Sequence, residues 1–148
     1  MRNEPGRFDL EGFLPYQLAV LAARVSRDFA RLYSQEFGIT IPEWRVIAHI
    51  AQAGTVSVRE IHARVDMDKS RISRAAGRLE AAGLVVKATS KGDRRLVALS
   101  LTKAGWALYT RIVPMAQRYE TEVLSRLDPE TAQRFRGTIR QLLEEEAV

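Results

Sequence analysis

Apolar residues recur at three- and four-residue spacing through most of the chain, a pattern typical of amphipathic helices. The first such stretch predicts a helix over residues 14–36, with Leu14, Leu18 and Leu21 on one narrow seam and Gly38 as its stop. At about 1.5 Å per residue, this helix is roughly 34 Å long. So long a helix with so narrow an apolar seam indicates packing against a second subunit or a second subdomain.

Capping signals predict three shorter helices in the middle of the chain. Thr40 and Glu43 have the spacing of a capping box, as do Ser57 and Glu60, and Asp68 provides a third start. These predicted helices run to Gly54, to about Val65 and to Ala82.

The hydrophobic period then changes from that of a helix to that of a strand. Residues 84–89 and 94–101 are predicted strands joined by a turn, because Leu99 and Leu101 alternate with small or polar residues. A helix, a short helix, a third helix and a hairpin in this order predict a winged helix-turn-helix. The expected fold class is therefore mainly α with a small β-hairpin (α+β).

Two more helices are predicted after the hairpin. Thr102 caps the first, which runs toward Leu127 and is expected to bend or break at Pro114. Asp128 and Pro129 open the last helix as its N-cap and its first-turn proline.

Positive charge is concentrated in one segment of the chain. The net charge is +5, and residues 57–103 contain 11 Lys and Arg against 5 Asp and Glu, whereas the remainder contains 12 against 13. Such localisation is expected of a phosphate-binding surface. A solvated basic face without a partner has the same pattern, so charge alone leaves both interpretations open.

The predicted helix after Asp68 contains much of this charge. Its apolar stripe faces inward, which leaves its first turns to enter a major groove, where Arg binds guanine or phosphate and Ser binds either. Gly77 lowers helix propensity by about 1 kcal/mol relative to alanine, which indicates a steric need for a small residue. At the hairpin tip, basic side chains suit a minor groove, and Asp93 is expected to orient an arginine. The predicted DNA-binding residues are Ser57, Lys69, Ser70, Arg71, Ser73, Arg74, Arg78, Lys91, Asp93, Arg94 and Arg95.

Three segments resemble the multiple antibiotic resistance regulator (MarR) family. Residues 92–105 are similar to the wing of that family, in which an Asp-x-Arg pair precedes a strand that ends in Leu-Thr, followed closely by Gly. Residues 73–85 resemble its recognition helix, with Arg-Leu-Glu and then Gly-Leu-Val, and residues 39–46 resemble the opening of its second helix.

The resemblance implies a homodimer that binds a pseudo-palindromic operator on double-stranded DNA, as a ligand-responsive repressor. Residues 1–38 and 102–148 would form a helical dimerisation region, and residues 39–101 a DNA-binding lobe. Small aromatic or anionic effectors would bind between the two parts, and no cofactor is expected. The candidate effector-binding residues, chosen for their expected place at this boundary, are Tyr16, Arg24, Trp44, Arg45 and His49.

Composition excludes several other classes of protein. A hydrophobic fraction of 46% and a charged fraction of 28%, with no apolar run or signal core, are expected of a soluble cytoplasmic chain without a membrane partner. With no cysteine and only two histidines, no metal site is expected. The sequence contains no recognisable nucleophile–base pair or phosphate-binding loop, so an enzyme is not expected.

Two alternatives to a sequence-specific regulator stay open. An architectural protein would bind duplex DNA through phosphates alone, although the localised charge argues against it. A winged-helix interaction module would place its hairpin against an acidic protein and bind DNA only weakly.

Overall fold

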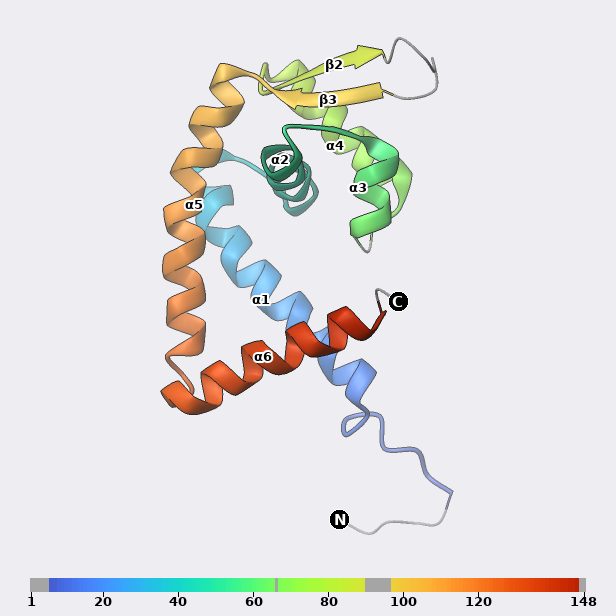
Figure 1. The fold of residues 1–148 in the computed structure, drawn as a ribbon, viewed down its shortest axis with the longest axis vertical. Coiled ribbons are helices and arrows are strands. Elements are labelled where there is room, and N and C mark those ends of the chain that lie inside the picture. The colour runs from blue at the N-terminus through green and yellow to red at the C-terminus, as the bar shows by residue number, and fades with distance from the viewer. Residues whose placement is uncertain (1–5, 66, 90–96, 147–148) are drawn as a thin grey trace. The chain divides into compact units, whose positions relative to one another are not determined.

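The computed structural model describes residues 6–65, 67–89 and 97–146 (Figure 1). The chain divides into two compact units, residues 1–109 and residues 110–148. No helix among the described residues is long and apolar enough to cross a membrane.

Four helices of the first unit begin and end close to where their capping signals predict. They are α1 (Leu14–Phe37), α2 (Ile41–Ala53), α3 (Val58–Arg64) and α4 (Lys69–Ala81). The Thr40–Glu43 capping box is formed as expected: Glu43 N donates to Thr40 Oγ1 at 3.3 Å, and Thr40 N donates to Glu43 Oε2 at 2.8 Å. Gly38 ends α1 with a φ of 68°, a conformation that favours glycine.

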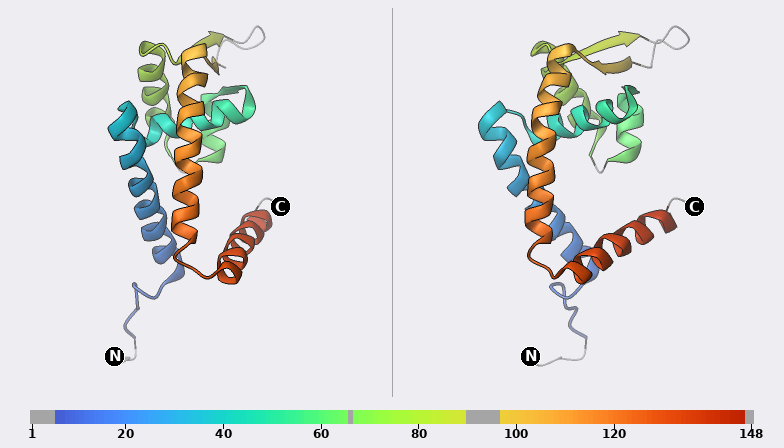
Figure 2. Two further views of the ribbon diagram at one scale, coloured as in Figure 1. Left: turned by 90° about the vertical axis from the view of Figure 1, so that its left-hand side faces the viewer. Right: turned by 60° about the vertical axis from the view of Figure 1, so that its left-hand side comes forward.

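A three-stranded antiparallel sheet follows the order β1-β3-β2, with β1 at Thr55–Ser57, β2 at Val85–Thr89 and β3 at Val97–Leu101. The predicted hairpin is confirmed as β2 and β3, which lie side by side in every ribbon view (Figure 2). Strand β1 was not predicted, because three residues are too few to show an alternating pattern. It pairs with β3 from Thr55 opposite Ser100 to Ser57 opposite Ala98.

The core of the first unit lies where α2 and α4 pack against each other and against the sheet. Helix α2 contributes Val46, Ile47 and Ile50 to this core, and strand β3 contributes Leu99; all four side chains are fully buried. From α4 the core takes Ile72, Ala75, Ala76 and Leu79. One face of α4 is therefore held by the core, and its opposite face is directed to solvent.

Two glycines differ in what they allow. A Cβ on Gly77 would meet nothing within 4 Å. The prediction that packing requires a small residue at position 77 is therefore wrong for contacts inside the chain. A Cβ on Gly105 would lie 2.1 Å from the carbonyl oxygen of Leu84. The chain needs glycine at position 105 because the start of α5 passes directly over the backbone that precedes β2.

Helix α5 (Lys103–Leu124) begins in the first unit and continues into the second, which also contains α6 (Pro129–Glu146). Thr102 caps α5 as predicted, since its Oγ1 accepts from Gly105 N at 3.0 Å. Helix α5 continues through Pro114, so the predicted interruption does not occur. Asp128 caps α6 as predicted by accepting from Thr131 N at 3.0 Å.

Candidate nucleic-acid interface

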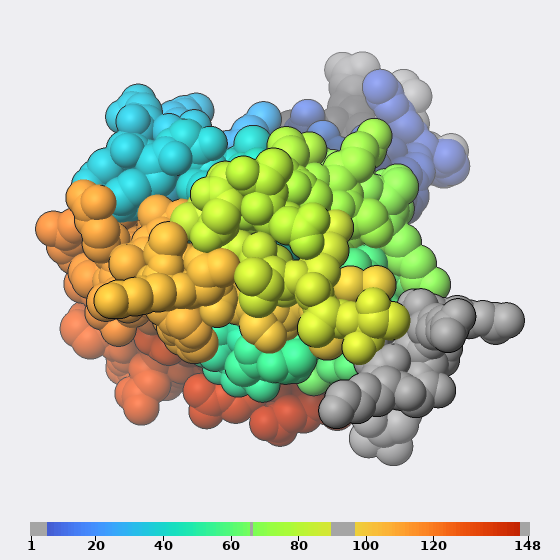
Figure 3. Space-filling view, turned by 90° about the horizontal axis from the view of Figure 1, so that it is seen from above, coloured from blue at the N-terminus to red at the C-terminus, as the bar shows by residue number. Residues whose placement is uncertain are grey.

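The solvent-directed side of α4 presents a cluster of polar and basic side chains. Five predicted DNA-binding residues of its first turns are exposed: Lys69, Ser70, Arg71, Ser73 and Arg74. Arg71, Arg74 and Arg78 are spaced i, i+3 and i+7, which places them along one edge of the helix. Seen from above, residues around the end of α4 and along β2 form one continuous surface (Figure 3). The geometry thus supports a basic helix that a duplex could approach from solvent.

The first turn of α4 is organised by Asp68. Its Oδ1 accepts from Ser70 Oγ at 2.7 Å and from Arg71 N at 2.8 Å. The hydrogen bond from the Ser70 hydroxyl, followed by that from the Arg71 amide, lowers the pKa of the Asp68 carboxyl below its ordinary value. Because the Ser70 proton is taken by Asp68, Ser70 can only accept a further hydrogen bond, which suits an amino group of adenine or cytosine.

An arginine-lined groove runs between the edge of α4 and the start of α2. It has a volume of about 400 Å³ and is lined by Thr40, Pro42, Arg71, Arg74 and Arg78. Sequence analysis identified the three arginines but not Thr40 or Pro42, because the start of α2 comes beside α4 only in the folded chain. We call it the arginine groove.

Behind the arginine groove, Glu43 forms an ion pair with Arg78. Arg78 Nε donates to Glu43 Oε1 at 2.9 Å, with the glutamate side chain 10% exposed and the arginine side chain 51% exposed. Burial acts to raise the pKa of the Glu43 carboxyl, but hydrogen bonds from the Thr40 amide and the Arg78 guanidinium outweigh it and hold the pKa below its ordinary value. Glu43 is therefore ionised at neutral pH and joins α2 to α4.

Ser57 differs from the other predicted DNA contacts. It is buried, and it caps α3 by accepting from Glu60 N at 3.1 Å while its hydroxyl donates to Glu60 Oε1 at 3.2 Å. Its exposure of 6% leaves no surface for a duplex. We therefore correct the sequence-based assignment and treat Ser57 as a cap of α3.

The predicted wing-tip contacts Lys91, Asp93, Arg94 and Arg95 lie outside the described residues. Their assignment to DNA binding stays a prediction. The described part of the hairpin adds Lys87 on β2, whose Nζ lies 3.9 Å from Glu80 Oε1 on α4.

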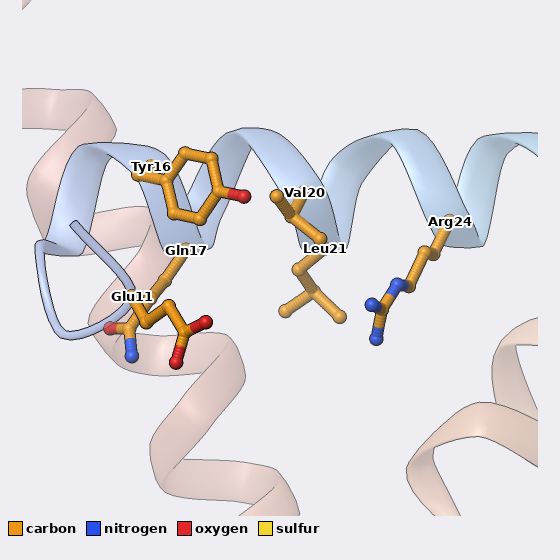
Figure 4. Close-up of a pocket in the computed structure, with 6 residues that line it drawn as sticks. All are labelled: Glu11, Tyr16, Gln17, Val20, Leu21 and Arg24. Carbon is orange, nitrogen blue, oxygen red and sulfur yellow. The ribbon is translucent and has the colours of Figure 1, made fainter.

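The candidate effector residues fall into two groups. Tyr16 and Arg24 line a groove of about 360 Å³ on α1, together with Glu11, Gln17, Val20 and Leu21. Figure 4 shows Glu11 beside Gln17 at one end, Arg24 at the other, and Val20 and Leu21 between them. This groove, which we call the α1 groove, combines an aromatic ring, aliphatic side chains and a cation.

Trp44, Arg45 and His49 lie elsewhere, on α2. The Trp44 ring lies 5.9 Å from the Phe29 ring and is stacked on Tyr109 at 6.1 Å, measured between ring centroids. Phe29 is 13 residues beyond Tyr16, or roughly 20 Å along α1 at about 1.5 Å per residue. The structure thus does not bring the five candidates into one site.

The two histidines have local backbone partners. His49 Nδ1 lies 2.7 Å from the carbonyl oxygen of Arg45, and His62 Nδ1 lies 2.8 Å from that of Met67. Since a carbonyl only accepts, each Nδ1 is the protonated donor. Among the described residues, no three His, Cys, Asp or Glu side chains are grouped so that they could hold a metal ion.

Known proteins share this arrangement along nearly the whole chain. The family model described as the MarR family matches residues 37–96. The crystal structure of a MarR family transcriptional regulator from Silicibacter pomeroyi DSS-3 is 30% identical in sequence, with a TM-score of 0.79 over 93% of this chain and 98% of that one. The chain belongs to the MarR family of transcriptional regulators. 

Other MarR family members agree with this assignment. A MarR/EmrR family regulator from Acinetobacter sp. ADP1 is 25% identical, with a TM-score of 0.80 over 95% of this chain and 98% of that one. The homoprotocatechuate degradative operon repressor of Escherichia coli is 25% identical over 85% of this chain and 86% of its own length. These matches confirm the predicted winged-helix fold, and they confirm a DNA-binding transcriptional regulator rather than an enzyme.

Membership of the MarR family supports DNA binding by this chain, whereas the role of α4 as the helix that meets DNA stays a prediction. Family membership does not explain why Thr40, Pro42 and Glu43 lie beside the arginines of α4. The sequence pattern did not connect these three residues with DNA binding. Thr40 and Glu43 have a strong local signal, but that signal is for capping α2. The 35-residue separation of Glu43 and Arg78 leaves no periodic pattern that would pair them.

Proposed function

We propose that this protein is a homodimeric repressor that binds a pseudo-palindromic operator and releases it when a small effector binds. The observation that carries the proposal is the basic edge of α4, where Arg71, Arg74 and Arg78 stand on a helix whose other face is held in the core. A helix supported in this way can enter a major groove without losing its shape. The protein would act on DNA in the cytoplasm.

Exposed apolar side chains on α1 support the homodimer. Leu14, Leu18, Leu21 and Leu32 are 58%, 47%, 47% and 41% exposed, although they belong to the apolar seam of an amphipathic helix. An apolar stripe of this kind is a feature of protein interfaces more than of monomer surfaces. The proposed partner for this stripe is a second copy of the chain.

Helix α6 has a stripe of its own, described within the second unit. Phe135, Ile139, Leu142 and Leu143 are 39%, 41%, 51% and 63% exposed. With α1, this stripe supports assigning residues 1–38 and 102–148 to dimerisation and residues 39–101 to DNA binding. Two copies related by a two-fold axis would place their α4 helices on half-sites about 34–36 Å apart, one turn of DNA.

The α1 groove supports a small aromatic or anionic effector. Its volume of about 360 Å³ suits a small molecule, the Tyr16 ring suits an aromatic body, and Arg24 suits a carboxylate. Binding would shift the population toward dimers whose α4 helices do not fit adjacent grooves. Repression is proposed because a relative, the Escherichia coli homoprotocatechuate protein, is named as a repressor.

Selection from a randomised duplex pool tests the proposal. The bound DNA is sequenced, and affinity for the recovered site is titrated against salt. Enrichment of a pseudo-palindrome with strong salt dependence supports a dimeric sequence-specific regulator. Salt-dependent binding without an enriched site would favour the architectural alternative, and absence of binding would favour the interaction module.

Effector release is tested on the recovered operator. Aromatic carboxylates, homoprotocatechuate among them, are added to the complex, and the loss of bound DNA is measured by fluorescence anisotropy. Arg24→Ala should abolish release while leaving the affinity for DNA unchanged. Release that persists in Arg24→Ala would remove the α1 groove from the proposal.

A further inference from the structure

The arginine groove is a concentration of positive charge on the surface of the first unit. Three guanidinium groups line it along one edge of α4, and Thr40 and Pro42 form its other wall at the start of α2. The positive end of the α2 dipole adds to the potential there. On a helix proposed to meet DNA, the anion that such a cationic groove would take is a phosphate of the duplex backbone.

Within the arginine groove, Arg78 differs from its two neighbours. Its Nε donates to the buried Glu43 carboxylate, which takes up one of the five N–H donors of the guanidinium. The side chain stays 51% exposed and lines the groove, so its remaining N–H donors are available to an anion there. An arginine side chain otherwise loses considerable rotamer freedom on binding, so fixing it in advance favours the complex.

We propose that this groove holds a backbone phosphate of the bound duplex, and that Glu43 is the positioning residue that fixes Arg78 for it. The proposal rests on the proposed DNA binding by α4 and adds an anchor that ties the duplex to the start of α2. Glu43 does not touch DNA and acts only through Arg78. The same ion pair also shields the phosphate from the carboxylate behind it.

This arrangement predicts an unusual result when the two residues are changed separately and together. Arg78→Gln removes one phosphate contact and leaves the Glu43 carboxylate without its cation, facing an anion. Glu43→Gln keeps the capping box, because glutamine also accepts from the Thr40 amide, and it releases Arg78. The double variant removes both the contact and the repulsion, and it contains no unpaired buried carboxylate that would prevent folding.

The experiment measures affinity for a random-sequence duplex and for the selected operator by fluorescence anisotropy across a salt series. Arg78→Gln should weaken binding to both duplexes by about the same factor, and the slope of log K against log salt should become shallower by about 0.9 per half-site. Glu43→Gln should weaken DNA binding roughly threefold and leave the salt slope unchanged. A factor of this size is expected when a charge-assisted hydrogen bond is lost in a partly exposed site. The double variant should bind DNA more tightly than Arg78→Gln alone.

Controls separate a positioning role from a structural one. Glu80→Gln makes the same chemical change on α4 at a carboxylate paired with Lys87, and it should leave affinity within about twofold, as expected for an exposed pair. Arg78→Lys keeps the charge without the planar fork, so it should restore the salt slope but not the full affinity. The midpoint of urea unfolding is measured for every variant in the same buffer.

The outcomes distinguish this proposal from DNA binding itself. If the wild type binds DNA but Arg78→Gln leaves affinity and salt slope unchanged, no phosphate occupies the groove. If the double variant is as weak as the product of the two single effects, Glu43 does not act through Arg78. If the wild type binds no duplex, the proposed function fails and this inference fails with it.

Discussion

Replacing two leucines on the exposed seam of α1 should dissociate the proposed homodimer. Leu18 and Leu21 are each 47% exposed in the single chain. Fully burying a leucine contributes about 1.5–3 kcal/mol, so the half still exposed contributes about 0.7–1.4 kcal/mol when a partner covers it. Because the dimer is symmetric, each substitution is present in both subunits and its effect on the dimerisation free energy is doubled. Leu18→Ala with Leu21→Ala should therefore weaken the dimer by about 3–6 kcal/mol, or about 100- to 10,000-fold in its dissociation constant.

Sedimentation equilibrium over a range of protein concentrations measures this dissociation constant. Alanine is the best helix former, so α1 should keep its helical content, which circular dichroism checks. Gln35→Ala, an exposed position near the end of α1, is the matched control and should leave the constant unchanged. A dissociation constant within about threefold of the wild type in the double variant, against the expected factor of about 100 or more, would refute the α1 seam as the dimer interface.

Four further predictions follow from individual residues. Arg74→Ala should weaken binding to operator and random duplex by a similar factor, since Arg74 lines the arginine groove; a loss of about 1–3 kcal/mol confined to the operator would instead make it a base contact. Gly77→Ala should raise the free energy of unfolding in urea by about 0.5–1 kcal/mol, because nothing lies within 4 Å of the added methyl group, and a decrease would contradict this. Gly105→Ala should lower the free energy of unfolding by about 1–3 kcal/mol, because its Cβ would lie 2.1 Å from the Leu84 oxygen. The lowered pKa of Glu43 stabilises the folded state at pH values above the ordinary pKa of 4.5, and this stabilisation is lost as pH falls through the folded-state pKa. Below pH 4.5, the thermal unfolding midpoint of Glu43→Gln should therefore depend less on pH than that of the wild type. Equal pH dependence of the two proteins would contradict the lowered pKa.

The helix boundaries were predictable because the signals that end helices are local. Thr40 and Glu43 are three residues apart and cap α2 by bonding each other. Gly38 and Asp128 act on the turn next to them in the same way. Such interactions are encoded in neighbouring residues, so a pattern within four positions is enough to find them.

The features that escaped prediction join residues far apart in the sequence. Strand β1 exists because Thr55 lies opposite Ser100, and no local period announces a three-residue strand. The Glu43–Arg78 pair joins two helices in the same way. Gly77 and Gly105 both lie within predicted helices, so the sequence does not distinguish them. Only at Gly105 would an added Cβ clash with a backbone atom.

Ser57 illustrates a different limit. A serine before a helix suits both a cap and a contact with phosphate, and its residue type does not distinguish the two roles. Burial decides between them, and burial at Ser57 follows from the pairing of β1 with β3. A polar side chain can be assigned to DNA only once the surface is known.

The aromatic cluster around Trp44 has a practical consequence for experiments. The chain has two tryptophans, and both contact Tyr109: Trp44 is stacked on it, and Trp106 meets it edge-on at 5.9 Å between ring centroids. All of the tryptophan fluorescence of the protein therefore comes from one place, where α1, α2 and the first turn of α5 meet. Its emission wavelength and lifetime give an intrinsic optical signal for rearrangement at this junction, without an attached dye.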